Sequence, residues 1–138
     1  MELVYLWIEN YKNIKNQGFN FSPRFKCSFE DGVLNIEENK NYKSIFPKNI
    51  NITAIVGKNG SGKSSVLEVI TNYNLINENQ VKAFIIFFHD GKFLKVSSIN
   101  FKCNIELKTI ENKILEKNIF YLNFSHFINL KTQINLRT

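Results

Sequence analysis

Residues 57 to 65 read GKNGSGKSS, which puts three glycines, two lysines and three serines into nine positions. They fit the pattern G-x-x-x-x-G-K-[ST] with Gly57, Gly62, Lys63 and Ser64 at the fixed positions. Glycine makes up about 7% of an average protein, so these positions seldom coincide by chance. The pattern predicts a loop that holds the phosphates of a nucleotide such as ATP.

The three glycines of this stretch have a direct physical use. A triphosphate presses its oxygens against the backbone, and Gly57, Gly60 and Gly62 have no Cβ to obstruct it. Glycine also accepts positive φ, which lets successive N–H groups converge on the β-phosphate. A helix that starts after Gly62 would direct its unpaired N–H groups and the positive end of its dipole toward the same anion.

The side chains at the end of the stretch add charge and metal binding. Lys63 is predicted to place a positive charge between the β- and γ-phosphates, and Ser64 to offer its hydroxyl to Mg²⁺. Ser65 can bond the α-phosphate. The predicted nucleotide-binding residues are Gly57, Lys58, Asn59, Gly60, Ser61, Gly62, Lys63, Ser64 and Ser65, with Ser64 as the metal ligand.

The flanking residues predict the elements that position this loop. The apolar run Asn51 to Val56 predicts a buried strand before it. Val66, Leu67 and Ile70 are spaced three and four apart after it, which predicts one face of a helix. A glycine-rich turn that binds nothing is the alternative, but a lysine and a hydroxyl at the start of a helix serve no packing purpose.

The rest of the chain is rich in predicted strands. Residues 3–11 and 18–22 predict two of them, and the alternating stretches 25–38 and 83–96 predict hairpins with Asp-Gly turns. Further elements expected are a strand over 101–107, a short helix over 110–118 and a strand over 119–124. The predicted fold class is therefore α/β: a P-loop NTPase with a mixed sheet and antiparallel hairpins around one strand–loop–helix unit.

Composition excludes several classes of protein. The chain has 138 residues, enough for one domain, and a formal net charge of +6. The lysines are scattered, which favours a solvated surface over a dedicated nucleic-acid site, although the charge would suit either. Cys27 and Cys103 form no CxxC pair, so zinc and redox motifs are absent. Buried reduced thiols are expected, with one disulfide as the alternative.

No targeting segment is evident in the sequence. The first ten residues lack the features of a signal peptide, and the longest apolar run, Ala83 to Phe88, is too short to span a bilayer. A cytoplasmic protein without a membrane partner is therefore expected.

The local spelling VGKNGSGKSSVLEVI resembles the ATP-binding cassette (ABC) branch of P-loop proteins, in which the loop reads N-G-S-G-K-S-[ST]. Within this branch the chain resembles the heads of SMC, RecF-like and OLD-like ATPases, which are often classed as AAA-family ATPases. Those begin with a strand, an N-[FY]-[KR] element and a hairpin. Here Asn10, Tyr11 and Lys12 precede the Asp31-Gly32 hairpin. The resemblance is specific over residues 51–70 and looser elsewhere.

The resemblance implies ATP and Mg²⁺ as ligands and a Walker A motif at residues 57–64. It also implies Lys12 and Asn13 as nucleotide contacts, and Asn59 near the γ-phosphate. The intact protein would form a homodimer with ATP between its heads and act with DNA or an effector protein, in DNA maintenance or phage defence. Residues 1–138 would form the single N-terminal ATP-binding lobe, and the C-terminal lobe would be absent.

Other motifs of such ATPases are not evident in the sequence. A Walker B strand, a signature motif and a switch histidine are missing. Asp90 follows an apolar run as a Walker B aspartate would, but Gly91 comes next and indicates a hairpin turn. Gln133 is the candidate for a Q-loop glutamine, the alternative being a polar tail, and His126 has no partner motif. The chain alone is expected to bind ATP with near-background hydrolysis.

Two other functions compete with this interpretation. A self-contained small nucleotide kinase would need phosphate-clamping arginines on a lid, and only Arg24 and Arg137 exist. A DNA-binding module would need a concentrated basic surface, which the scattered lysines do not provide.

Overall fold

The computed structural model describes residues 1–47 and 50–110. Its elements in chain order are β1 (Glu2–Tyr11), β2 (Ile14–Asn20), β3 (Phe25–Glu30), β4 (Val33–Glu38), α1 (Lys63–Thr71), α2 (Asn74–Asn77), β5 (Lys82–His89), β6 (Lys92–Ser97), β7 (Lys102–Cys103) and β8 (Leu107–Thr109). They build two sheets in place of the single mixed sheet predicted. One has five strands in the order β2-β1-β5-β6-β8, and the other has three in the order β3-β4-β7.

The two predicted Asp-Gly hairpins are confirmed. Asp31 and Gly32 join β3 to β4 with φ values of 50° and 75°, and Asp90 and Gly91 join β5 to β6 with 49° and 73°. Two successive residues of positive φ match the twist of the paired strands, and Asp-Gly accepts this conformation readily. The local sequence therefore fixes both turns.

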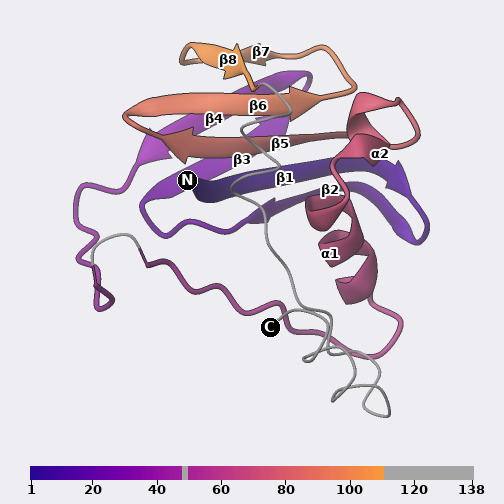
Figure 1. The fold of residues 1–138 in the computed structure, drawn as a ribbon, viewed down its shortest axis with the longest axis horizontal. Helices are drawn as coiled ribbons and strands as arrows, with labels where there is room; N and C mark the ends of the chain where they lie inside the picture. The colour runs from indigo at the N-terminus through magenta and orange to yellow at the C-terminus, as the bar shows by residue number, and fades with distance from the viewer. Residues whose placement is uncertain (48–49, 111–138) are drawn as a thin grey trace, which may run out of the picture.

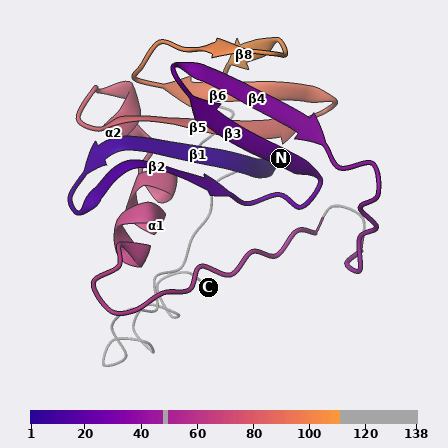
Figure 2. The ribbon, with the colours of Figure 1, turned by 180° about the vertical axis from the view of Figure 1, so that it is seen from behind.

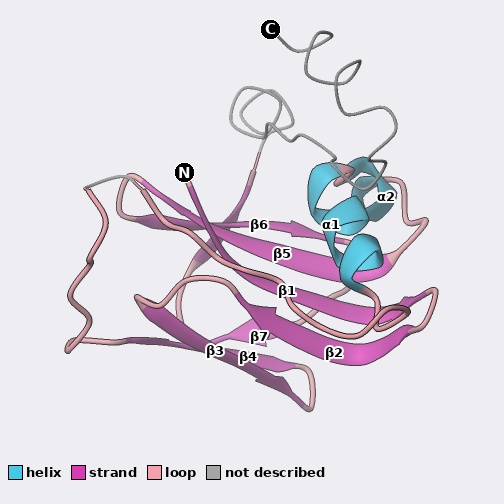
Figure 3. Ribbon diagram, turned by 90° about the horizontal axis from the view of Figure 1, so that it is seen from below, coloured by secondary structure: helices cyan, strands magenta, loops and turns pink. Residues whose placement is uncertain are grey.

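The elements form three layers, with the five-stranded sheet in the middle. Figures 1 and 2 show α1 and α2 on one side of this sheet, and Figure 3 shows β3, β4 and β7 on the other. The helices bury Val66, Val69 and Ile76 against one face of the sheet. Phe25, Cys27, Leu34 and Ile36 of the small sheet pack with the residues of its other face.

Strand β5 explains why a long apolar run occurs in an antiparallel sheet. Ala83, Ile85 and Phe87 belong to the cluster beneath the helices, and Phe84 and Ile86 belong to the cluster beneath the small sheet. Successive side chains of a strand point to opposite faces, and here both faces are covered. All five side chains are therefore buried.

The predicted strand over Asn51 to Val56 is wrong: the segment is irregular and pairs with no strand of the described residues. Ile52 is 64% exposed and Val56 86%. A strand is defined by the ladder of hydrogen bonds to a neighbour, and an apolar sequence does not supply that neighbour. The strand–loop–helix unit predicted from the sequence is reduced to a loop and a helix.

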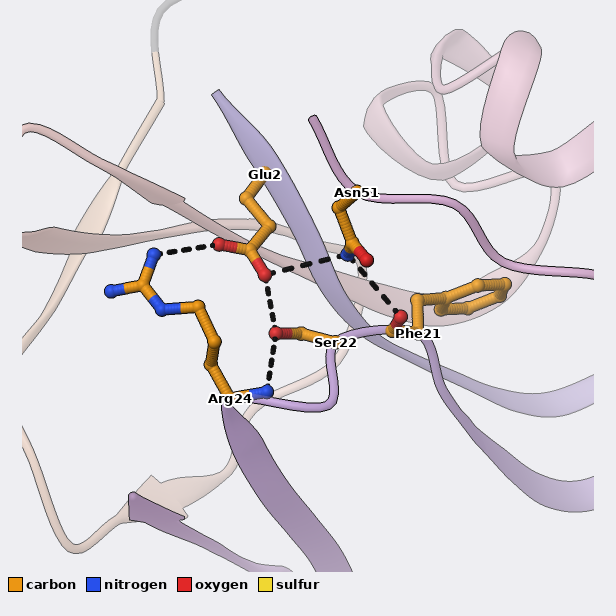
Figure 4. Close-up of polar contacts among 5 residues, drawn as sticks. All are labelled: Glu2, Phe21, Ser22, Arg24 and Asn51. Carbon is orange, nitrogen blue, oxygen red and sulfur yellow. Dashed lines mark hydrogen bonds and ion pairs between the residues drawn. The ribbon is translucent and has the colours of Figure 1, made fainter. Parts of the chain in front are cut away.

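Side-chain bonds hold this irregular segment against the sheet instead. Asn51 Nδ2 donates to Glu2 Oε1 at 3.4 Å and to the Phe21 carbonyl at 3.5 Å, as Figure 4 shows. Glu2 also accepts from Arg24 Nη1 at 3.1 Å and from the Ser22 hydroxyl. Further along, Thr53 Oγ1 donates to the Phe21 carbonyl at 2.7 Å. The approach to the glycine stretch is thus fixed at its start.

Two smaller predictions also differ from the structure. The strict alternation over residues 101–107 yields only the short strands β7 and β8, which pair in parallel with β4 and β6. The four-residue helix α2 forms within a segment whose many asparagines predict poor helix formation, and Ile76 anchors it in the core with no exposed surface. Tertiary burial outweighs propensity there.

The remaining expectations concern membrane spans and the end of the chain. Over residues 1–47 and 50–110, no helix has the length and apolarity needed to cross a membrane. The predicted helix over 110–118 and strand over 119–124 lie outside the described residues, apart from Ile110.

Both cysteines are free thiols; Cys27 is buried and Cys103 is partly exposed. Burial raises the pKa of the Cys27 thiol from 9.0 to about 12, and burial likewise raises the pKa of Tyr5 from 10.0 to about 12. The folded state therefore keeps protons that the unfolded state releases above about pH 9. By linkage, stability falls as the pH rises through this window.

We expect the free energy of unfolding to be nearly constant from about pH 7 to 8.5 and to decline between pH 9 and 12. In Cys27→Ala only the Tyr5 contribution remains, so the decline should begin nearer pH 10. Urea unfolding followed by circular dichroism at stepped pH measures this, with Cys103→Ala as the matched control. An unchanged onset in Cys27→Ala would contradict the assignment to this thiol.

Candidate functional site

Residues 57–62, called the glycine loop below, lead directly into helix α1. Gly60 and Gly62 have φ values of +79° and +98°, a conformation that side chains with a Cβ rarely adopt. Gly62 is the N-cap of α1, and its carbonyl accepts the first helical bond from the Val66 N–H at 3.0 Å. The predicted start of the helix at Lys63 is confirmed, so its free N–H groups lie beside the loop.

A cavity of about 240 Å³ opens where the loop meets the helix. Its lining residues all come from the predicted site: Asn13, Asn59, Gly60, Gly62, Lys63, Ser64 and Ser65. A larger hollow of about 450 Å³ lies between Asn20 and Asn39, lined by Phe25, Lys26 and Glu37 among others. It has neither a helix N-terminus nor a glycine turn, so size alone does not mark the candidate site.

Lys63 folds back over the glycine loop. Its ammonium group donates to the carbonyl of Lys58 at 2.8 Å and to the carbonyl of Gly57 at 2.5 Å. These two neutral carbonyl groups hold the positive charge of Lys63 beside the first two residues of the glycine loop. Charged acceptors bind an ammonium group about twice as strongly, so an anion that enters the cavity would compete well for Lys63.

The two serines after Lys63 differ in exposure. Ser64 is exposed at the first turn of α1, and Ser65 is buried. One hydroxyl is thus open to solvent at the cavity, as a metal-binding hydroxyl would need to be. Over the described ranges there is no group of three or more His, Cys, Asp or Glu side chains that could hold a metal by itself.

The two upstream candidates lie at the turn between β1 and β2, beside the loop. Asn13 Nδ2 donates to the Gly60 carbonyl at 2.7 Å. Lys12 Nζ binds Glu68 Oε2 of α1, also at 2.7 Å, and both side chains are exposed. The hydrogen bond from Lys12 lowers the pKa of Glu68. Asn13 therefore lines the cavity and Lys12 contacts the helix that follows the loop, and each binds protein in this structure.

Glu68 is the residue that the sequence analysis missed. It lies one turn into α1, and its partner Lys12 is 56 positions away. Tyr11 adds to this contact: burial, and then its hydrogen bond to Glu68, raises the pKa of the phenol. No spacing pattern in the sequence joins these three residues, because the turn reaches the helix only once β1 has taken its place in the sheet.

The other candidates do not join the site. Asp90 lies in the hairpin turn, 3.4 Å from the His89 ring, and its side chain is 86% exposed. The hairpin interpretation of Asp90 and Gly91 is confirmed, because β5 and β6 pair on either side of them. Gln133 and His126 lie outside the described residues.

Gly62→Ala is expected to destabilise the protein more than Gly91→Ala. Both glycines have positive φ, so both changes strain the backbone by about 1 kcal/mol. A Cβ at Gly62 would also lie 3.0 Å from the buried side chain of Ile14, whereas one at Gly91 meets nothing within 4 Å. The free energy of unfolding of both variants, measured in urea, separates the backbone strain from the contact with Ile14. Equal losses would show that the contact with Ile14 is unimportant.

Comparison with known proteins identifies a distant relative. The chain is 32% identical over 124 residues to the phosphate import ATP-binding protein PstB of Mycoplasma genitalium. The match covers 86% of this chain and 36% of that protein, so the chain spans about a third of its relative's length. No protein-family model and no solved structure matches. The similarity supports a P-loop ATPase of the ABC type as the coarse class.

Proposed function

We propose that residues 1–138 form the nucleotide-binding lobe of an ABC-type ATPase and that the glycine loop binds Mg·ATP. The observation that carries the proposal is the convergence of Gly60, Gly62, Lys63 and Ser64 on one cavity at the start of α1. Similarity to an ATP-binding protein supports the same ligand. The expected nucleotide-binding residues are those of the whole run from Gly57 to Ser65.

The geometry of the loop fits a phosphate group. A Cβ at Gly57 would lie 2.5 Å from Ser61 Oγ, so a side chain at this position would require the Ser61 hydroxyl to turn away. The N–H groups of the first turn of α1 have no helical acceptor and suit an anion. Lys63 would exchange its two carbonyl partners for phosphate oxygens, which are the stronger acceptors.

Ser64 is the residue expected to hold the magnesium ion. Its exposed hydroxyl lies beside Lys63 at the cavity. Mg²⁺ would neutralise charge on the β- and γ-phosphate oxygens when bound. Ser65 is buried but also lines the cavity, and its hydroxyl is expected to bond the α-phosphate.

Finer assignments rest on the resemblance to SMC, RecF-like and OLD-like heads. By that resemblance the intact protein would form a homodimer with ATP between its heads. It would use hydrolysis with DNA or an effector, in DNA maintenance or phage defence, in the cytoplasm. Residues 1–138 would be its N-terminal lobe. Hydrolysis needs a carboxylate that activates water, so the lobe alone should turn over ATP at a near-background rate.

Isothermal titration of the 138-residue chain with ATP, with and without Mg²⁺, tests the proposal. Saturable binding that strengthens with Mg²⁺ is the expected result, and ADP should bind through the same loop. A phosphate-release assay on the same sample measures turnover. A chain that binds no nucleotide in either condition would refute the assignment.

A further inference from the structure

We propose that Asn13, which lines the candidate cavity, is a positioning residue of the nucleotide site: its side-chain amide donates to the Gly60 carbonyl and so holds the glycine loop in its binding shape, instead of donating to the γ-phosphate. The inference deepens the proposed function and rests on it. It reassigns a residue that the sequence resemblance places among the nucleotide contacts.

The first support is the way the loop is attached to the rest of the protein. The bonds within the loop and its helix are local: the Ser61 N–H donates to the Lys58 carbonyl at 3.1 Å, and Lys63 binds the carbonyls of Gly57 and Lys58. The bond from Asn13 to Gly60 spans 47 positions. Among the described residues it is the one hydrogen bond that ties the glycine loop to an element other than α1, the helix that follows it directly.

The second support is the residue that receives this bond. Gly60 has a φ of +79° and open space around the position of a Cβ, so packing does not fix its conformation. Glycine loses more conformational freedom on ordering than any other residue. A hydrogen bond to the Gly60 carbonyl therefore restricts the loop at the point where its backbone is freest.

The third support is the direction in which the carbonyl is held. A carbonyl oxygen repels an anion, so an anion-binding loop must turn its N–H groups toward the ligand and its carbonyls away. At Gly60 the carbonyl oxygen accepts a bond from Asn13 Nδ2 of the β1–β2 turn, so its negative charge is partly neutralised by a protein donor. The next-but-one residue, Gly62, also lies against this turn, since a Cβ there would approach Ile14 and Asn13 Oδ1 at 3.0 and 3.4 Å.

The fourth support is the shape of the turn itself. Lys12 has a φ of +52°, which is uncommon for a residue other than glycine. Strand pairing continues up to Tyr11 and Ile14, so only Lys12 and Asn13 form the turn. In this conformation Lys12 reaches Glu68 on α1 while Asn13 reaches the loop. This two-residue turn therefore bonds to both the glycine loop and helix α1.

The experiment compares Asn13→Ala with wild type in the 138-residue chain, with Lys15→Ala as a control on the same hairpin. Hydrogen exchange without nucleotide is measured first. The amides of residues 58–62 should exchange several-fold faster in Asn13→Ala, while those of β5 keep wild-type protection. Dissociation constants for Mg·ATP and Mg·ADP follow, and both should rise by the same factor, roughly tenfold.

The outcomes separate this inference from the proposed function. A loss confined to ATP would mean that Asn13 contacts the γ-phosphate, and unchanged loop exchange would mean that it holds nothing in place; either result overturns the inference. If wild type binds no nucleotide, the proposed function fails. The amide exchange of residues 58–62 still tests whether the bond from Asn13 to Gly60 holds the loop in place. Asn13→Gln keeps the side-chain amide but adds one methylene. It should restore part of the protection from hydrogen exchange that the loop amides lose in Asn13→Ala.

Discussion

Lys63→Ala is expected to remove most of the stabilisation that Mg·ATP confers on the chain. A ligand at 100 times its Kd stabilises the folded state by about 2.7 kcal/mol, which raises the Tm of a domain of this size by roughly 9 °C. Charge-assisted hydrogen bonds contribute about 1.5–3 kcal/mol, so their loss would raise the Kd at least about tenfold. At the same ATP concentration the stabilisation would then fall to about 1.4 kcal/mol or less.

Thermal unfolding with and without Mg·ATP measures this effect. Lys92→Ala is the matched control, because Lys92 is an exposed lysine at the start of β6, away from the glycine loop. Lys92→Ala should show the same ATP-dependent rise in Tm as wild type. The nucleotide-free Tm of Lys63→Ala should stay near the wild-type value, since within residues 1–47 and 50–110 the Lys63 ammonium has no hydrogen-bond partners beyond the loop carbonyls of Gly57 and Lys58. An equal ATP-dependent shift in Lys63→Ala and wild type would refute the role assigned to Lys63.

Phe84→Ala should cause the largest loss of stability, about 3–5 kcal/mol. Phe84 has no exposed surface and lies at the centre of the layer between the two sheets. Its ring stacks on Phe101 at 4.2 Å and contacts the Phe29 ring edge-on at 5.1 Å. Truncation to alanine would remove these contacts and leave a cavity that the surrounding strands can fill only in part.

Urea unfolding of Phe84→Ala and Ile45→Ala makes the comparison. Ile45 is 88% exposed, so its truncation should change the free energy of unfolding by less than about 0.5 kcal/mol. Domains of this kind are stable by about 5–15 kcal/mol, so Phe84→Ala would remove a large part of the total. A loss below about 1 kcal/mol would show that the two sheets are not packed tightly at this ring.

Much of the fold could be predicted from local sequence. The Asp31-Gly32 and Asp90-Gly91 turns form where two residues accept positive φ between alternating strands. The helix begins at Lys63 because glycine precedes it and apolar residues recur at helical spacing. For the site, the family resemblance implied that Lys12 and Asn13 contact the nucleotide, but it did not indicate the bonds from Lys12 to Glu68 and from Asn13 to Gly60.

Other features depend on contacts that no local pattern encodes. Residues 51–56 have the composition of a strand, yet they remain irregular because no described strand lies beside them to complete the hydrogen-bond ladder. The separation into two sheets depends on which faces of β1 and β5 the small sheet covers. Strand pairing therefore had to be decided by the tertiary structure.

The sequence by itself determined the glycine loop. Its backbone freedom comes from its glycines and its charge from its lysine, and these are properties of single residues. The tertiary structure decided what holds that loop. Only when β1 enters the sheet does its turn bring Asn13 to Gly60 and Lys12 to Glu68. Bonds across 47 and 56 positions form at the cost of closing long segments of chain, and it is the packing of the whole sheet that offsets that cost.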